Sequence, residues 1–192
     1  MISQRKIAVH WMKNLAALLV ALSMFMVLPS ERAMAREVDE YAVKAAFVLN
    51  FVRFTLWPEN QFTKDTDSYR LCFMGNTNVA KEFAAINGKK NGERNIYVHD
   101  LSSGVEWNKC DIIFISRDTD PLVSKQIIAK VKGMPVLIIG ETREFIKQGG
   151  VINFFSKGNR LHFEINTRAA ENQGLKLSSR LLKLAVIVDG SQ

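Results

Sequence analysis

The stretch VINFFSKGNRLHFEIN, residues 151–166, alternates apolar and polar side chains on both sides of the pair Gly158-Asn159. This pair is common in tight hairpin turns, so the stretch predicts an antiparallel β-hairpin. One face then pairs Phe154 with Phe163, Ile152 with Ile165 and Ser156 with Leu161. The opposite face pairs Phe155 with His162 and Asn153 with Glu164. A slip by one residue would exchange the two faces, so the register should be firm, with the first face in a core.

Apolar strand segments alternate with helical segments upstream of the hairpin. Strands are expected at residues 69–74, 95–98, 111–116 and 135–139. Helices are expected after Gly75, from Pro121 to about Lys132, and over 142–147, 167–172 and 179–188. Such alternation is typical of a parallel sheet covered on both faces. The predicted fold is therefore α/β: a layered, mostly parallel sheet flanked by helices, with the antiparallel hairpin appended at its edge.

The first 35 residues have the features of a secretory signal peptide. Basic residues precede a short apolar run from Leu15 to Leu28, and Ala33-Met34-Ala35 fits a small-x-small cleavage site. A retained membrane anchor is the alternative, but about 14 apolar residues fall short of the roughly 20 that span a bilayer. The sequence thus predicts a signal peptide at 1–35 and a single domain, outside the cytoplasm, at 36–192.

The positive charge of the chain comes partly from this leader. The net charge is +7 overall, and residues 36–192 keep 22 basic and 18 acidic side chains. No run of Lys and Arg with interleaved aromatic residues remains in that part, so the sequence does not indicate nucleic-acid binding.

Two cysteines, Cys72 and Cys110, follow the leader. An oxidising compartment favours a disulfide between them. The alternative is two separate buried thiols, because Cys is often simply a small core residue.

The sequence gives little support to catalysis, a cofactor or a metal. His99 and His162 are the only histidines after residue 35, and neither has a partner at metal-ligand spacing. No GxSxG motif occurs, and neither cysteine has a histidine base nearby in sequence. Gly75-Asn76-Thr77-Asn78 is best read as an ordinary strand-to-helix turn, and Asp118 and Asp120 as turn and cap residues before Pro121. We therefore expect a binding protein and not an enzyme.

A helix is predicted from Val38 to Trp57, ended by Pro58. It has two apolar sectors, one with Tyr41 and the other with Phe51. One sector can cover the domain's own sheet, and the second needs another partner. Internal packing is the default for it, and a second subunit or a ligand is the alternative. The residues that would then make dimer or ligand contacts are Lys44, Asn50, Phe51 and Arg53.

Four segments resemble the YfiR family of periplasmic regulators: YAVKAAFVLNFVRFTLWP at 41–58, GGVINF at 149–154, FEIN at 163–166 and GLKLSSRLLKLA at 174–185. The resemblance covers almost all of the chain after residue 35. It implies a periplasmic α/β protein, often a homodimer, that binds the periplasmic part of an inner-membrane diguanylate cyclase. Such binding would repress the cyclase and thereby control cyclic di-GMP and biofilm formation.

The resemblance also implies particular residues. The cysteines 72 and 110 match the family's bridge, whereas the second cysteine pair that some members carry around 144–153 is absent. The matching partner-binding positions are Ile152, Glu164 and Ala170, with Asn153 beside Glu164 across the hairpin. The proposed register conflicts with this at Ile152, which it buries. A free Glu164 would instead pair with Arg160 or Arg168 at the surface.

A second function remains open at the level of sequence. The chain could be a periplasmic sensor subunit that binds a small ligand, which the sequence does not identify, and acts on a membrane histidine kinase. The neighbouring gene would separate the two readings, because a membrane-bound cyclase supports repression and a kinase supports sensing.

Overall fold

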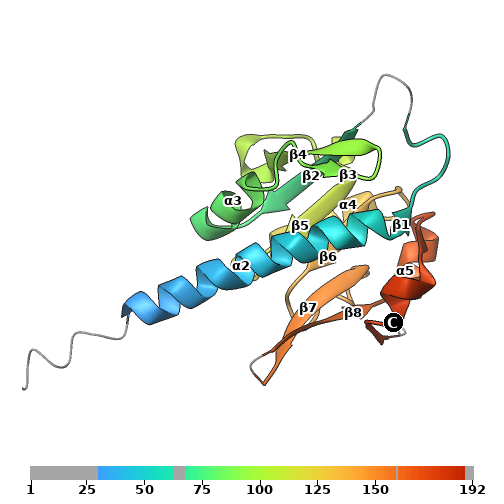
Figure 1. Ribbon diagram of the computed structural model, residues 1–192. Helices are drawn as coiled ribbons and strands as arrows, with labels where there is room; N and C mark the ends of the chain where they lie inside the picture. The colour runs from blue at the N-terminus through green and yellow to red at the C-terminus, as the bar shows by residue number, and fades with distance from the viewer. Residues whose placement is uncertain (1–29, 63–67, 159, 189–192) are drawn as a thin grey trace, which may run out of the picture. The chain divides into compact units, whose positions relative to one another are not determined.

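Residues 30–62, 68–158 and 160–188 are described by a computed structural model of the chain (Figure 1). The chain divides into two units, residues 1–39 and 40–192. Residues 1–29 of the predicted signal peptide lie outside the described residues. Within the described ranges, no helix has both the length and the apolar character that crossing a membrane requires.

A mixed sheet of eight strands forms the centre of the second unit. Along the chain the strands are β2 (Ser68–Met74), β3 (Lys90–Asn91), β4 (Arg94–Asp100), β5 (Ile112–Ile115), β6 (Leu137–Gly140), β7 (Ile152–Lys157), β8 (Arg160–Ile165) and β10 (Val186–Ile187). Across the sheet the order is β10-β8-β7-β6-β5-β2-β4-β3. The pairs β3–β4 and β7–β8 are antiparallel, and the other neighbours are parallel. The predicted fold class is therefore confirmed.

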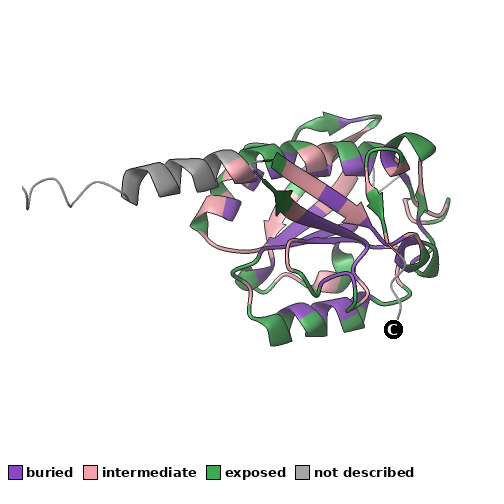
Figure 2. Cartoon of the chain, turned by 90° about the horizontal axis from the view of Figure 1, so that it is seen from below, coloured by how far each residue is buried: buried purple, intermediate pink, exposed green. Residues whose placement is uncertain are grey.

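Helices lie on both faces of this sheet. They are α2 (Ser30–Arg53), α3 (Thr77–Ala84), α4 (Pro121–Val131), α5 (Thr167–Asn172) and α6 (Ser179–Leu182). In Figure 1, the part of α2 from Glu40 to Arg53 crosses in front of the sheet and α4 lies behind it. Figure 2 shows that buried residues concentrate in the strands and on the sides of the helices that face them. A separate two-stranded antiparallel sheet joins β1 (Thr55–Leu56) to β9 (Lys176–Leu177).

The hairpin β7–β8 has the predicted register. Asn153 lies opposite Glu164, Phe154 opposite Phe163 and Phe155 opposite His162. The apolar face is buried against α2, where the Phe51 ring centroid lies 5.4 Å from that of Phe154 and 4.9 Å from that of Phe163. The second apolar sector of α2 therefore packs inside the domain, and the side chain of Phe51 is fully buried.

The sequence predicted that the hairpin forms the edge of the sheet, and this prediction is wrong. Strand β10 adds outside β8, with Val186 opposite Glu164 and Ile187 opposite Ile165. The predicted last helix accordingly ends early, at Leu182, because the residues that follow pair with the sheet.

Two other predicted helices differ from the structure. Helix α2 ends at Arg53, since Thr55 pairs with Leu177 of β9. Residues 142–147 form turns and not a regular helix. Here Phe145 packs so closely on two glycines that an added Cβ would lie 2.3 Å from its ring at Gly140 and 2.1 Å from it at Gly150. This packing sets the path of the loop, and neither hydrophobic periodicity nor helix propensity could have predicted it.

Cys72 of β2 and Cys110, just before β5, form a disulfide with a Cα–Cα distance of 5.9 Å. Both side chains are buried, and β2 and β5 are neighbours in the sheet. The bridge therefore joins two strands that already pair.

Candidate functional site

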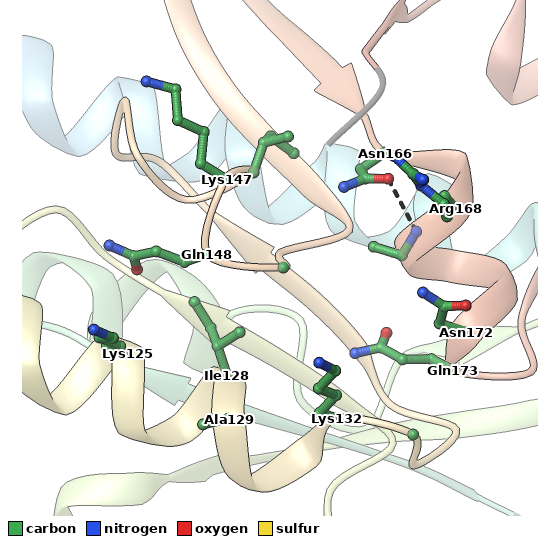
Figure 3. A pocket seen from close by; sticks show the side chains of 14 residues that line it. Lys125, Ile128, Ala129, Lys132, Lys147, Gln148, Asn166, Arg168, Asn172 and Gln173 are labelled. Carbon is green, nitrogen blue, oxygen red and sulfur yellow. Dashed lines mark hydrogen bonds between the residues drawn. The ribbon is translucent and has the colours of Figure 1, made fainter. Parts of the chain in front are cut away.

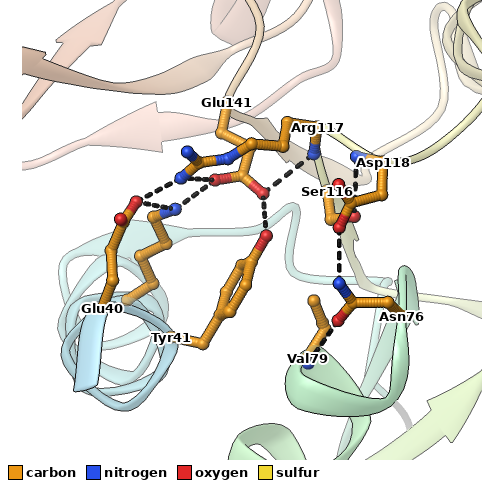
Figure 4. A network of polar contacts seen from close by, with 9 residues as sticks. Glu40, Tyr41, Asn76, Val79, Ser116, Arg117, Asp118 and Glu141 are labelled. Carbon is orange, nitrogen blue, oxygen red and sulfur yellow. Dashed lines mark hydrogen bonds and ion pairs between the residues drawn. The ribbon is translucent and has the colours of Figure 1, made fainter. Parts of the chain in front are cut away.

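The carboxylate of Glu141 is the centre of a polar cluster at the carboxyl ends of two parallel strands (Figure 4). Glu141 follows β6, and Arg117 lies two residues beyond β5. The Tyr41 hydroxyl and the Arg117 backbone N–H each donate to Glu141 Oε1 at 2.9 Å. Lys44 Nζ donates to Glu141 Oε2, and Arg117 Nη2 lies 3.1 Å from the same oxygen. Both oxygens are thus saturated by donors from α2 and from the loop after β5.

Glu40 adds a second carboxylate to the cluster. Its Oε1 lies 2.5 Å from Lys44 Nζ and also accepts from Arg117 Nη2. Burial by itself would raise the pKa of Glu40, but the Lys44 ammonium and the Arg117 guanidinium outweigh it and hold this pKa below 4.5. Two carboxylates and two cations therefore balance one another at neutral pH.

Tyr41 serves this cluster as a neutral donor. Burial, followed by the negative charge of Glu141, raises the pKa of the Tyr41 hydroxyl well above its ordinary value of 10. Its phenol proton consequently stays in place throughout the physiological range and keeps one oxygen of Glu141 occupied.

A cleft of about 470 Å³ opens beside the cluster. It is lined by Glu40, Lys44, Arg117, Glu141, Arg143, Asn153, Phe154, Phe155, Ser156, Leu161 and Glu164. Asn153 Nδ2 donates to Glu164 Oε1 at 2.9 Å. The other polar atom of that amide, Asn153 Oδ1, is buried and has no hydrogen-bond partner among the described residues. The cleft thus offers an unused acceptor next to balanced charges, which suits a polar group of low net charge.

The cleft brings together residues that were predicted separately. Lys44 was a candidate contact on the first helix, and Asn153 and Glu164 were assigned to the hairpin. Lys44 and Asn153 are almost completely buried, whereas Glu164 is half-buried. Of these three side chains, Glu164 is the one that a large partner can reach.

The remaining predicted contacts lie elsewhere. Ile152 and Ala170 are 0% and 2% exposed, so in this structure neither side chain is presented to a partner. The burial of Ile152 follows from its place on the core face of the hairpin. Phe51 is core, while Asn50 and Arg53 are exposed on α2. Asn50 Nδ2 donates to the carbonyl of Ala46 within the same helix.

Sequence reasoning missed Glu40, Tyr41, Arg117 and Glu141. A usable signal was present for two of them, because Arg117 and Glu141 come within two residues of the predicted strands 111–116 and 135–139, which the structure shows to be neighbours. In open parallel sheets, ligand sites gather at these carboxyl ends. Nothing in the local sequence could pair them with α2, which contributes residues about a hundred positions earlier.

The polar residues near β2 and β5 act as predicted, in caps and turns. Asn76 caps α3 by accepting from the N–H groups of Asn78 and Val79, and its Nδ2 donates to Asp118 at 2.7 Å. Asp120 caps α4 by accepting from Leu122 N. Among the described residues, no three His, Cys, Asp or Glu side chains are grouped so that they could hold a metal ion.

Comparison with known proteins gives one informative match. A family model described as YfiR/HmsC-like matches residues 41–186, which include the cleft except for Glu40. No curated protein matches the chain. Among solved structures, the crystal structure of an ABC domain in complex with L-Trp from Streptococcus pneumonia is similar with a TM-score of 0.45 and 13% identity, over 62% of this chain and 55% of that chain. With the family model matching most of its length, the chain belongs to the YfiR/HmsC-like family of periplasmic regulators of cyclic di-GMP signalling.

Proposed function

We propose that this protein binds the periplasmic part of an inner-membrane diguanylate cyclase and holds that enzyme inactive. The docking face consists of Phe155, His162 and Glu164 on the outer side of the hairpin, with Val186 of β10 beside them. Family membership supports a regulator of cyclic di-GMP signalling, and a diguanylate cyclase, the enzyme that makes cyclic di-GMP, is the partner that we propose for this role.

The observation that carries the proposal is the setting of Glu164. Its carboxylate is half-buried and is oriented by Asn153, while Val186, its neighbour across the strands, is 50% exposed. Phe155 and His162 stack beside it, with ring centroids 5.6 Å apart. A fixed charge surrounded by accessible apolar and aromatic surface is typical of the centre of a protein interface.

Purification from membranes tests this proposal. The wild-type protein should retain the intact cyclase when both are co-expressed and the membranes are solubilised. Loss of the protein should raise cellular cyclic di-GMP, and restoring it should lower the level again. Cyclic di-GMP that does not respond to the protein, together with no retained cyclase, would contradict the proposal.

One observation favours a second candidate, a small-ligand sensor that acts on a membrane histidine kinase. Asn153 lines the cleft next to charged side chains from α2 and from the loops after β5 and β6, and its Oδ1 has no hydrogen-bond partner in the part of the chain that the structure describes. A small polar ligand could donate to this oxygen. Retention of a kinase from solubilised membranes, in place of a cyclase, would favour this candidate.

A further inference from the structure

A second groove, of about 690 Å³, lies between α4, α5 and the loop before β7 (Figure 3). It shares no lining residue with the cleft beside Glu141. Figure 3 shows Lys132, directly after α4, and Gln173, directly after α5, directed toward the same space. The groove is thus a separate concave site that the proposed docking does not use.

The groove is strongly basic. Its lining includes Lys125, Lys132, Lys147 and Arg168 and contains no Asp or Glu. Lys147 pairs at 3.2 Å with Glu144, which lies outside the lining. Lys125 of α4 and Lys132, directly after this helix, have no such ion pair among the described residues and carry positive charge into the groove. Lysines on one wall of a concave surface attract anions, because the shape concentrates their field.

Gln173 gives an independent indication of a ligand. The residue is 5% exposed, and its Oε1 is buried without a hydrogen-bond partner among the described residues. A buried acceptor without a donor destabilises a fold, so an unmet one in a groove suggests a group that binds there. The missing donor should be neutral, since a cationic donor would be repelled by the lysines. A hydroxyl group meets this requirement.

We propose that this groove binds a polyol phosphate, with the phosphate between Lys125 and Lys132 and a hydroxyl donating to Gln173 Oε1. A dianionic phosphate matches the two lysines, and the neighbouring hydroxyl reaches the acceptor that the fold leaves open. Free glycerol phosphates and phosphoglycerol lipid headgroups share this chemistry. The proposal is independent of the cyclase, because the site lies apart from the docking face.

Binding of sn-glycerol 3-phosphate, measured by calorimetry on the isolated protein, tests the charged part of the site. The double variant Lys125→Gln/Lys132→Gln should weaken this binding about tenfold or more, because two charge-assisted contacts are lost. The matched control Lys81→Gln/Lys89→Gln removes the same charge away from the groove and should change affinity little. Equal weakening by both double variants would overturn the site, as would no binding of glycerol 3-phosphate by the wild type.

Gln173→Met tests the acceptor separately. Replacing an amide whose buried oxygen is unsatisfied by an apolar side chain of similar length should raise the melting temperature of the ligand-free protein. The same variant should weaken the binding of glycerol 3-phosphate about tenfold. It should leave the binding of inorganic phosphate unchanged, since inorganic phosphate has no polyol hydroxyl. Unchanged affinity for glycerol 3-phosphate would overturn the assignment of Gln173.

Vesicles distinguish the two sources of the ligand. Binding to phosphatidylglycerol vesicles that is lost in the Lys125→Gln/Lys132→Gln variant, but not in the control, would assign the site to lipid headgroups. Binding of glycerol 3-phosphate without any vesicle binding would assign it to a free ligand. Both results support the shared chemistry.

Discussion

Lys44 is a buried cation, and its contribution to the stability of the fold depends on its ion pair with Glu141. Its side chain is 1% exposed and that of Glu141 is 2% exposed, so the pair has lost nearly all of its hydration. Removing one member of such a pair leaves the other charge poorly compensated. Lys44→Met should therefore lower the free energy of unfolding by about 3 kcal/mol, measured by urea denaturation.

Lys147→Met is the control for this substitution. Lys147 and Glu144 form an exposed pair, and losing it should cost less than about 1 kcal/mol. Equal effects of the two substitutions would show that the burial of Lys44 has no energetic importance.

Glu40 makes the stability of the protein sensitive to low pH. Because the folded-state pKa of Glu40 lies below 4.5, its stabilising contribution is complete above that pH and is lost as the pH falls toward the folded-state value. Asp111 acts in the opposite direction. Burial raises its pKa despite hydrogen bonds from Arg70 N and Gln61. Its contribution to the free energy of unfolding therefore declines as the pH rises above 3.8.

The comparison of wild type with Glu40→Gln isolates the first effect. The difference in melting temperature between the two proteins should be largest at neutral pH and should shrink as the pH falls below 4.5. A difference that stays constant down to strongly acidic pH would contradict the assigned ion pairs of Glu40.

Glu164 is the residue on which the proposed docking depends. Glu164→Lys should leave the fold and the disulfide intact, weaken binding of the cyclase and raise cellular cyclic di-GMP. Losing a buried charge contact at an interface costs about 2 to 5 kcal/mol of binding. Glu171→Lys, at an exposed position of α5, makes the same charge change as a control. A folded Glu164→Lys protein with unchanged affinity would exclude this residue from the interface.

At the scale of elements, α2 packs on the hairpin through aromatic contacts in the domain's core. Phe51 lies against both Phe154 and Phe163 and has no exposed surface. Phe51→Ala should therefore lower the free energy of unfolding by about 3 to 5 kcal/mol, and Phe51→Glu should unfold the protein. Val43→Ala, at a position of α2 that is 46% exposed, should cost less than about 0.5 kcal/mol. A folded, monomeric Phe51→Glu protein would instead place this residue in a subunit interface.

Elements whose signals are local were predictable from sequence. The hairpin register followed from the alternation around Gly158, and α4 from Pro121 and its cap Asp120. Elements decided by distant pairing were not predictable: β10 forms because Val186 and Ile187 lie beside β8, although the preceding residues favour a helix. The site shows the same division. The place of Glu164 on the outer face of the hairpin followed from alternation, whereas the contact of Lys44 with Glu141 joins residues 97 positions apart.

At the scale of the whole molecule, the disulfide limits the freedom of the unfolded chain. Cys72 and Cys110 are 38 positions apart, and closing such a loop stabilises by about 4 kcal/mol in the chain-entropy model. Cys72→Ala should lower stability by a comparable amount, and a reductant should then have no further effect on the variant. The intact mass of the periplasmic protein should match an oxidised chain that begins at Arg36. Two alkylatable thiols in that protein would contradict the bridge.

The same bridge decides how the molecule would respond to mechanical force. If the chain is pulled from its two ends, tension passes from Cys72 in β2 to Cys110, two residues before β5, through the sulfur atoms, so that α3, β3 and β4 carry no load along the chain. About 130 Å of contour length stays hidden while the bridge is closed, given roughly 3.4 Å per extended residue. The oxidised protein would therefore extend less than the reduced one. The loop from Cys72 to Cys110, which contains β4, would remain covalently closed under tension.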